Sequence, residues 1–343
     1  MAGRAFIDRI SPISLGVGIS LSLLALLVVS ETVLGRWDAL LAGEDFNPLA
    51  REPTGVLRDL RLAIVHCLLV GYLPAAFLHV MRNGRRTVTR LQGALDCTRE
   101  ECETLANSIR LSKRGMLVAA LIGFVIALVP PYFVQPVPDA PWDPAGWDAE
   151  VVWHRVLGPL TGVGQAWLAY AITAVSLRMS RIAQRLNRID LLDLTPLAPF
   201  AQQGLTNALL LVGVLSVWSL TMLETGFIMI MMVIGSSTLV LAVLVLVAPV
   251  RGVHKRVREA KQQELAWIGS QIADLKTALS DARPDRKSGD LADMAAYRTL
   301  IENVPEWPFS GSTYVRLFIY ALIPLASWGV GIVAEEAVGR LIF

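Results

Sequence analysis

The sequence predicts an all-α protein that crosses a membrane about seven times and carries helical extensions on the cytoplasmic side. Three observations lead to this fold class. Hydrophobic residues make up 54% of the 343-residue chain, charged residues make up only 17%, and apolar runs of about 20 residues recur along it. So few charges do not cover the surface of a soluble protein of this length. A helix of about 20 apolar residues, by contrast, spans the bilayer core and satisfies its own backbone.

Seven apolar runs have the length of a membrane span. The first follows Arg4 and Arg9 and is longer than the apolar core of a signal peptide, so we expect it to remain as a transmembrane helix. The expected spans are 13–34, 62–81, 115–134, 153–177, 206–223, 227–250 and 313–333.

Basic residues follow every second span. The stretch between Met116 and Trp153 instead has no Lys or Arg and carries four acidic residues. By the positive-inside rule, the N-terminus is expected in the cytoplasm and the C-terminus outside. We therefore expect a multi-pass protein of the cell membrane, such as the bacterial inner membrane. The basic clusters are Arg82, Arg85, Arg86 and Arg90; Arg178, Arg181, Arg185 and Arg188; and Arg251, Lys255, Arg256, Arg258 and Lys261.

This topology divides the chain into five regions. They are 1–81, with the first two spans and the outer loop 35–61; 82–114, a cytoplasmic heptad-patterned helical segment; 115–250, with spans three to six, the outer loop 135–152 and a cytoplasmic extension 178–205; 251–312, a cytoplasmic helical hairpin; and 313–343, with the last span and an outer C-terminus.

Apolar residues in two cytoplasmic segments recur every three or four positions. The first pattern runs from Val88 to Ile109 and the second from Val253 to Leu279. Such spacing is typical of coiled coils, so we expect these segments to join copies of the chain into a homo-oligomer. Turn residues follow the second pattern, and a return helix over roughly 291–304 would complete a hairpin.

Two proline-containing elbows lie on the cytoplasmic side. At the elbow over 304–309, Trp307 and Phe309 are expected to lie at the membrane interface. At the elbow over 193–200, we expect the side chain of Thr195 to cap a new helix. The fourth span is expected to continue as one helix as far as Asp193.

The three cysteines do not predict a disulfide framework. Cys67 lies in an apolar run, whereas Cys97 and Cys102 lie in a segment expected in the reducing cytoplasm. With only four histidines in the chain, we predict no metal or other cofactor. The sequence also lacks the common phosphate-binding, dinucleotide-binding, zinc-protease and serine-hydrolase motifs, so an enzyme is not expected.

Polar residues inside the spans are the candidates for a functional site, because a polar group in hydrocarbon is costly. Almost all are uncharged, which argues against a transporter coupled to protons or ions. The same residues also fit hydrogen bonds between helices. The candidate pore-lining or ligand-lining residues are His66, Tyr72, His79, Gln165, Ser216, Ser219, Glu224 and Ser236.

Three functions fit this layout. The first is an oligomeric ion channel or ligand-responsive pore assembled through the cytoplasmic helices. The second is a membrane signalling or scaffold protein that docks a cytoplasmic partner, and the third is a transporter of a small apolar or lipid-like molecule. The expected partners are the lipid bilayer, further copies of the chain and a cytoplasmic protein, but not nucleic acid.

Overall fold

A computed structural model describes residues 11–33, 55–95, 97–134, 149–186, 189–221, 228–281 and 287–307, together with Val315 and Ile319. Every regular element in these ranges is a helix, which confirms the all-α class. Five stretches of these helices are long and apolar enough to cross a membrane. They are Pro12–Val33, Arg61–Arg90, Arg155–Ala183, Thr195–Trp218 and Val233–Thr277.

The two other expected spans are not among these five. The span expected over 115–134 lies in a helix of 22 residues, α7 (Lys113–Val134). Its described outer positions, such as Leu121 and Val125, are exposed apolar residues. The span expected over 313–333 lies outside the described residues apart from two single positions. The count of seven spans therefore stays a prediction.

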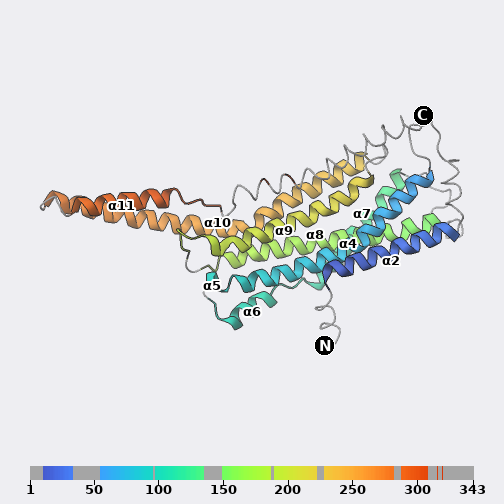
Figure 1. Ribbon diagram of the computed structural model, residues 1–343, viewed down its shortest axis with the longest axis horizontal. Helices are drawn as coiled ribbons and strands as arrows, with labels where there is room; N and C mark the ends of the chain where they lie inside the picture. Colours follow the sequence, from blue (N-terminus) through green and yellow to red (C-terminus); the bar gives the residue numbers. More distant parts are fainter. Residues whose placement is uncertain are drawn as a thin grey trace.

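Four helices form the centre of the bundle, and two lie at its edge (Figure 1). The central helices pack on one another: α4 contacts α8 and α9, and α10 contacts α8 and α9. At the edge, α2 packs on α4 and α7 packs on α8. The bounds are α2 (Pro12–Val33), α4 (Gly55–Arg90), α8 (Ala149–Ala183), α9 (Ala198–Trp218) and α10 (Ile228–Asp281).

An arm projects from one end of the bundle, and we call this the arm end (Figure 1). It consists of the second half of α10, a helix of 54 residues, and of α11 (Lys287–Glu302). The two helices run antiparallel, because Lys261 bonds to the carbonyls of Glu302 and Val304 while Glu264 bonds to Tyr297. Helix α10 is thus shared between the bundle and the arm.

Glycines allow the edge helices to approach the centre closely. A Cβ on Gly123 of α7 would collide with the backbone oxygen of Gly162 on α8, and the reverse is also true. Gly16 of α2 and Gly71 of α4 meet in the same way. Absence of a side chain at these crossings brings the helix backbones into contact, as in other membrane bundles.

The connection between α8 and α9 differs from the expectation. Helix α8 ends at Ala183 rather than near Asp193. The carbonyl of Leu186, just beyond that end, accepts hydrogen bonds from the Arg256 guanidinium at 2.6 and 3.2 Å. Because this carbonyl is satisfied by α10, the chain can leave the helix there without an unpaired group.

The helix that contains the fifth expected span begins before 206, at the elbow where a new helix was expected. The short helix η2 (Thr195–Leu197) leads directly into α9, so the helical run begins 11 residues earlier, at Thr195. Proline at the first helical positions fits this geometry because those N–H groups have no partner within the helix. The N-cap position is Leu194, with no side-chain cap, and not Thr195; the Thr195 N–H instead donates to Asp193 Oδ1 at 3.0 Å.

The segment expected as one heptad-patterned helix over 82–114 is divided among the end of α4, α5 (Gln92–Leu95) and α6 (Arg99–Asn107). Helix α6 folds back against α4. A capping box between Thr98 and Glu101 starts α6 after the break. Apolar positions of this segment are buried within the chain rather than on a free face: Val88, Leu91, Leu95, Cys102 and Ile109.

Three residues of the second apolar pattern are likewise covered by the chain itself. Val253, Val257 and Ile268 of α10 have no exposed surface. Gly252, next to the first of them, lies against the backbone of Ser180 on α8. Neither pattern leaves these residues available for a coiled coil with another copy.

The expectation of no disulfide was wrong for one pair. Cys97 and Cys102 are joined by a disulfide with a Cα to Cα distance of 6.0 Å. The break between α5 and α6 makes this possible, because it brings two cysteines five positions apart to the same place. Cys67 stays a free, buried cysteine within α4.

Candidate functional site

A chain of hydrogen-bonded polar side chains crosses the bundle near its arm end. We call it the polar network, and it comprises Asn83 and Thr87 of α4, Gln203 and Asn207 of α9, and Ser176 of α8. Four of the five residues are at least 97% buried, and Asn83 is partly buried. Buried polar groups of this kind are stable only when they are hydrogen-bonded.

The hydrogen bonds of the polar network run in one direction. Asn83 and Thr87 donate to Oε1 of Gln203 at 2.9 and 3.0 Å. Gln203 donates to Oδ1 of Asn207, and Asn207 donates to Ser176 Oγ, both at 2.9 Å.

The last member connects to the fourth central helix. Ser176 Oγ donates to the carbonyl oxygen of Val245 on α10 at 3.4 Å. No member of the polar network titrates near neutral pH, so it does not suit proton transfer. Its chemistry suits holding α4, α8, α9 and α10 in one register.

The sequence interpretation missed every member of the polar network. It placed Gln203 in a cytoplasmic extension and so did not ask whether the residue is buried. A signal was present, because Gln203 and Asn207 are one helical turn apart in the stretch 189–250, which contains no Lys or Arg. Two amides on one face of such a helix favour a hydrogen-bonded contact with neighbouring helices.

Two of the candidate lining residues lie in contacts between helices. His66 is 6% exposed, and its ring meets the Trp218 ring of α9 edge-on, with centroids 6.3 Å apart. The Tyr72 hydroxyl donates to the Leu210 carbonyl of α9 at 2.9 Å. Its ring end lies where a side chain on Gly213 would be. Both residues therefore join α4 to α9.

The candidate serines point back to their own helices. Ser216 donates to the Val212 carbonyl at 3.0 Å, Ser219 to the Ser216 carbonyl at 2.8 Å, and Ser236 to the Val233 carbonyl at 3.2 Å. A hydroxyl that donates in this way keeps its oxygen lone pairs, so these contacts do not distinguish a pore-lining serine from a packing one. Ser219 is buried and Ser236 is exposed.

The remaining candidates differ in burial. His79 is exposed on α4. Gln165 is partly buried, and its Nε2 has no hydrogen-bond partner among the described residues. Glu224 lies outside the described residues.

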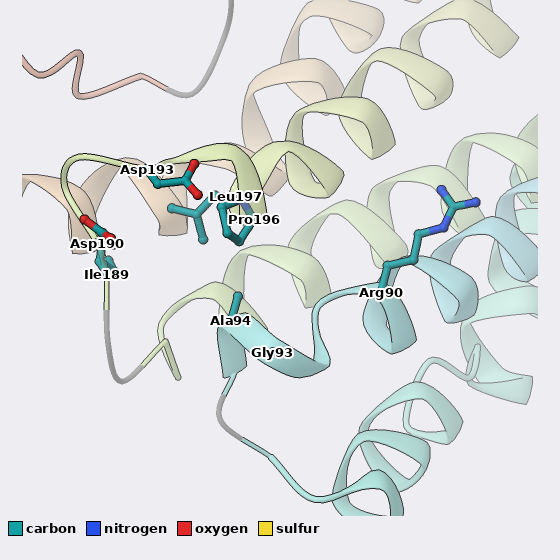
Figure 2. A pocket seen from close by; sticks show the side chains of 8 residues that line it. All are labelled: Arg90, Gly93, Ala94, Ile189, Asp190, Asp193, Pro196 and Leu197. Atoms are coloured by element: carbon teal, nitrogen blue, oxygen red, sulfur yellow. The ribbon is translucent and has the colours of Figure 1, made fainter.

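A recess of about 290 Å³ opens at the arm end, beside the connection between α8 and α9 (Figure 2). Arg90 stands at one side of it, and Asp190 and Asp193 stand at the other (Figure 2). Hydrogen bonds from the Thr195 hydroxyl and backbone N–H hold the pKa of the Asp193 carboxyl below its usual range. The Arg90 guanidinium points away from the other lining side chains (Figure 2). The recess is at the small end of the range for ligand pockets.

The elbow before the last expected span is attached to α10. Trp307 stacks on the His254 ring with centroids 4.3 Å apart and planes 12° from parallel. His254 Nδ1 also lies 3.2 Å from the Glu306 carbonyl oxygen. Trp307 remains 38% exposed, and Phe309 lies outside the described residues.

Within the described part of the chain, no three His, Cys, Asp or Glu side chains come close enough to hold a metal ion. Comparison with protein-family models, with curated proteins and with solved structures finds no match.

Proposed function

We propose that the protein is a seven-span membrane signalling or scaffold protein whose arm docks a cytoplasmic protein partner. The proposed orientation has the N-terminus inside and the C-terminus outside. The arm end supports it, because Arg90 of α4, Lys113 of α7 and Arg181 of α8 lie at this end of their helices. Arg251 lies within α10, next to Gly252, which packs against Ser180 near the same end of α8. Such a concentration of basic residues is typical of the cytoplasmic side.

The observation that carries the proposal is Trp267, which lies on the arm and is 47% exposed. It follows Val250, the end of the expected sixth span, by 17 residues of one continuous helix, or about 25 Å. At that distance the indole does not reach the membrane interface, where exposed tryptophans usually lie. Trp307 does fit the interface, because it packs beside His254, near the base of the arm.

An exposed indole in water is best explained by a protein contact. Tryptophan is enriched among the residues that dominate binding energy, and it typically fills an apolar pocket of the partner. The neighbours of Trp267 along its helix face, Gln263 and Ser270, are exposed and uncharged. We therefore propose a partner with an apolar cleft surrounded by polar groups.

Helix α10 gives the arm a direct connection to the spans. Its Val245 carbonyl is the acceptor at the end of the polar network. A rearrangement that breaks the network would remove one of the contacts between α10 and α8, beside the Gly252 contact and the Arg256 bonds at the base of the arm. This arrangement suits a protein that relays a change in the membrane to a cytoplasmic partner.

A crosslinking experiment tests the docking surface. A photoreactive benzophenone amino acid replaces Trp267 in one variant and Thr277, which is also exposed on α10, in a control. We expect an adduct with a single protein from position 267 and little from position 277. Equal labelling at the two positions would contradict the proposal. An adduct between two copies of the chain would instead support homo-oligomer formation.

An oligomeric channel is the second candidate. The observation that favours it is that Ser236 and Ser237 are exposed on α10, in the part expected within the membrane. A pore would then lie between copies, with these hydroxyls along it. Ion flux from liposomes containing the purified chain, blocked by modification of Ser236→Cys, would favour the channel over the scaffold. Release of an apolar solute alone would favour the transporter.

Reporter fusions test the topology. A reporter that is active only outside the cytoplasm should be active after residue 343 and inactive when inserted after Asp281, at the end of α10. A reporter that is active at both positions, or inactive at both, would place them on the same side of the membrane. That result would contradict an odd number of crossings between them.

A further inference from the structure

The disulfide between Cys97 and Cys102 occupies a position where it can be made and broken. It closes the break between α5 and α6 on the arm-end side of the bundle. Cys102 is 2% exposed, whereas Cys97 is only partly buried. A thiol from solution therefore reaches Cys97 first. Disulfides in a reducing compartment are usually transient or regulatory.

We propose that Cys97 and Cys102 form a reversible thiol–disulfide site that exchanges with a cytoplasmic thiol such as glutathione. The inference rests on the proposed cytoplasmic placement of the arm end. In this scheme, the disulfide links the start of α6 covalently to the end of α5 in the oxidised state, and the link is absent in the reduced state.

Reduction starts when a glutathione thiolate attacks Cys97 Sγ. The bond between the two cysteine sulfurs breaks, Cys102 leaves as a thiolate, and glutathione stays attached to Cys97. A second glutathione attacks the sulfur of the first, which releases Cys97 and one glutathione disulfide. Two glutathione molecules are oxidised and one protein disulfide is reduced, and oxidation by glutathione disulfide is the reverse.

The two redox states differ in how α6 is held. The capping box uses the Thr98 hydroxyl and the Glu101 carboxylate but no sulfur, so α6 begins in the same way in both states. Ala106 and Ile109 are buried in the disulfide state, and we expect them to stay buried after reduction. The change is therefore confined to the short connection over 95–98. Gly93 and Ala94, which line the recess in Figure 2, lie immediately before it.

The first test uses the full chain with Cys67→Ser, reconstituted in nanodiscs and equilibrated with glutathione buffers. Differential alkylation and mass spectrometry measure the ratio of disulfide to dithiol. We expect the ratio to fall by at least about tenfold from glutathione disulfide to excess reduced glutathione. A pair that stays oxidised in reduced glutathione, or that never forms in glutathione disulfide, would overturn the proposal.

The order of attack gives a matched pair of variants. With Cys102→Ser, the adduct that glutathione disulfide forms on Cys97 has no neighbouring thiol to displace the glutathione and should accumulate. With Cys97→Ser, the buried Cys102 should remain largely unmodified. Equal adduct on both variants would contradict the assigned order and the role of burial. Hydrogen exchange at 95–98 should become roughly tenfold faster on reduction of the parent chain.

Labelling in sealed vesicles separates this proposal from the topology on which it rests. A membrane-impermeant maleimide should react with Cys97 of the Cys102→Ser variant in inside-out vesicles only. Labelling only in right-side-out vesicles would place Cys97 outside the cytoplasm. That result would contradict the proposed topology, and cytoplasmic glutathione could then not act as the reductant. Labelling from the inner face without glutathione exchange would overturn the redox proposal and leave the topology intact.

Discussion

Gln203 donates a hydrogen bond to Asn207, one turn further along α9, and neither side chain has any exposed surface. Each amide also reaches a different neighbouring helix. Gln203 accepts from Thr87 of α4, and Asn207 donates to Ser176 of α8. Two amides on a single helix thus determine how three helices are aligned.

Removal of the Asn207 amide should leave buried partners unsatisfied. We expect Asn207→Ala to lower the free energy of unfolding by about 1–2 kcal/mol, since the Gln203 amide loses its acceptor. Thermal unfolding in detergent, followed by circular dichroism, measures the change. Thr206→Ala is the control, because the Thr206 hydroxyl bonds only to the Gln202 carbonyl of its own helix. Equal losses in the two variants would show that the network contributes little.

A single methyl group at the crossing of α7 and α8 should be destabilising. A Cβ on Gly123 meets backbone at Gly162, which cannot move as a flexible side chain can. We expect Gly123→Ala to cost about 1–3 kcal/mol. Gly235→Ala is the control, because nothing lies within 4 Å of a Cβ there. The same thermal unfolding assay measures both variants. If Gly123→Ala lowered the free energy of unfolding no more than Gly235→Ala does, α7 and α8 would have to lie farther apart than the structure shows.

The start of α6 should depend on pH through Glu101. Hydrogen bonds from the Thr98 backbone N–H and hydroxyl hold the pKa of this carboxyl below its ordinary value of 4.5. Because folding favours the ionised form, the stabilisation is present above the ordinary pKa and is lost as the pH falls through the folded-state pKa. Amide exchange in α6, corrected for intrinsic rates, should therefore accelerate below about pH 4.

Glu101→Gln is the control for this pH dependence. Glutamine keeps the capping geometry but has no titrating carboxyl, so its exchange should be flat across the same range. Glu103, which pairs with Arg99, is present in both proteins and so cancels in the comparison. Identical pH profiles of the two proteins would exclude Glu101 as the cause.

The arm should loosen when Tyr297 loses its hydroxyl. The phenol donates to Glu264 Oε1 at 3.0 Å and joins α11 to α10. This bond, with the charge of Glu264, raises the pKa of Tyr297 above its ordinary value of 10.0. The bond is therefore present at neutral pH and is lost only as the pH rises through the folded-state pKa.

We expect Tyr297→Phe to speed the local opening of α11 by about fivefold, equivalent to about 1 kcal/mol. Hydrogen exchange over 287–302 measures this opening. Thr299→Ala is the matched control, because its hydroxyl bonds to the Ala295 carbonyl within α11. If the Tyr297→Phe protein exchanged no faster than the Thr299→Ala control, packing alone would account for the attachment of α11 to α10.

Hydropathy was enough to predict the described helices of the bundle. The first span, expected over 13–34, is helix Pro12–Val33, and the expected span 153–177 lies within α8. A long apolar run in a bilayer usually forms a helix, because a helix makes all its backbone hydrogen bonds within the segment itself. Helix ends were less predictable. The end of α8 depends on Arg256, which is distant in sequence and bonds to the Leu186 carbonyl.

The sequence did not predict which residues contact one another in the folded chain. Heptad spacing identified Val257 and Ile268 as one apolar face, but could not tell whether the chain or a second copy covers it. In the same way, His66 and Ser236 are both polar residues of predicted spans, yet one is buried and the other exposed. The rotation of each helix about its axis decides such differences, and neighbouring helices determine that rotation.

The sequence by itself thus determined that the protein is helical and apolar enough for a membrane, because both follow from local composition and the needs of the backbone. The tertiary structure alone decided that Asn83, Thr87, Ser176, Gln203 and Asn207 form one network and that Cys97 meets Cys102. Those pairings depend on where α9 crosses α4 and α8 and on where the chain breaks before α6. Close packing at glycines such as Gly123 and Gly162 determines where helices cross, and no periodicity in the sequence specifies which pair will meet.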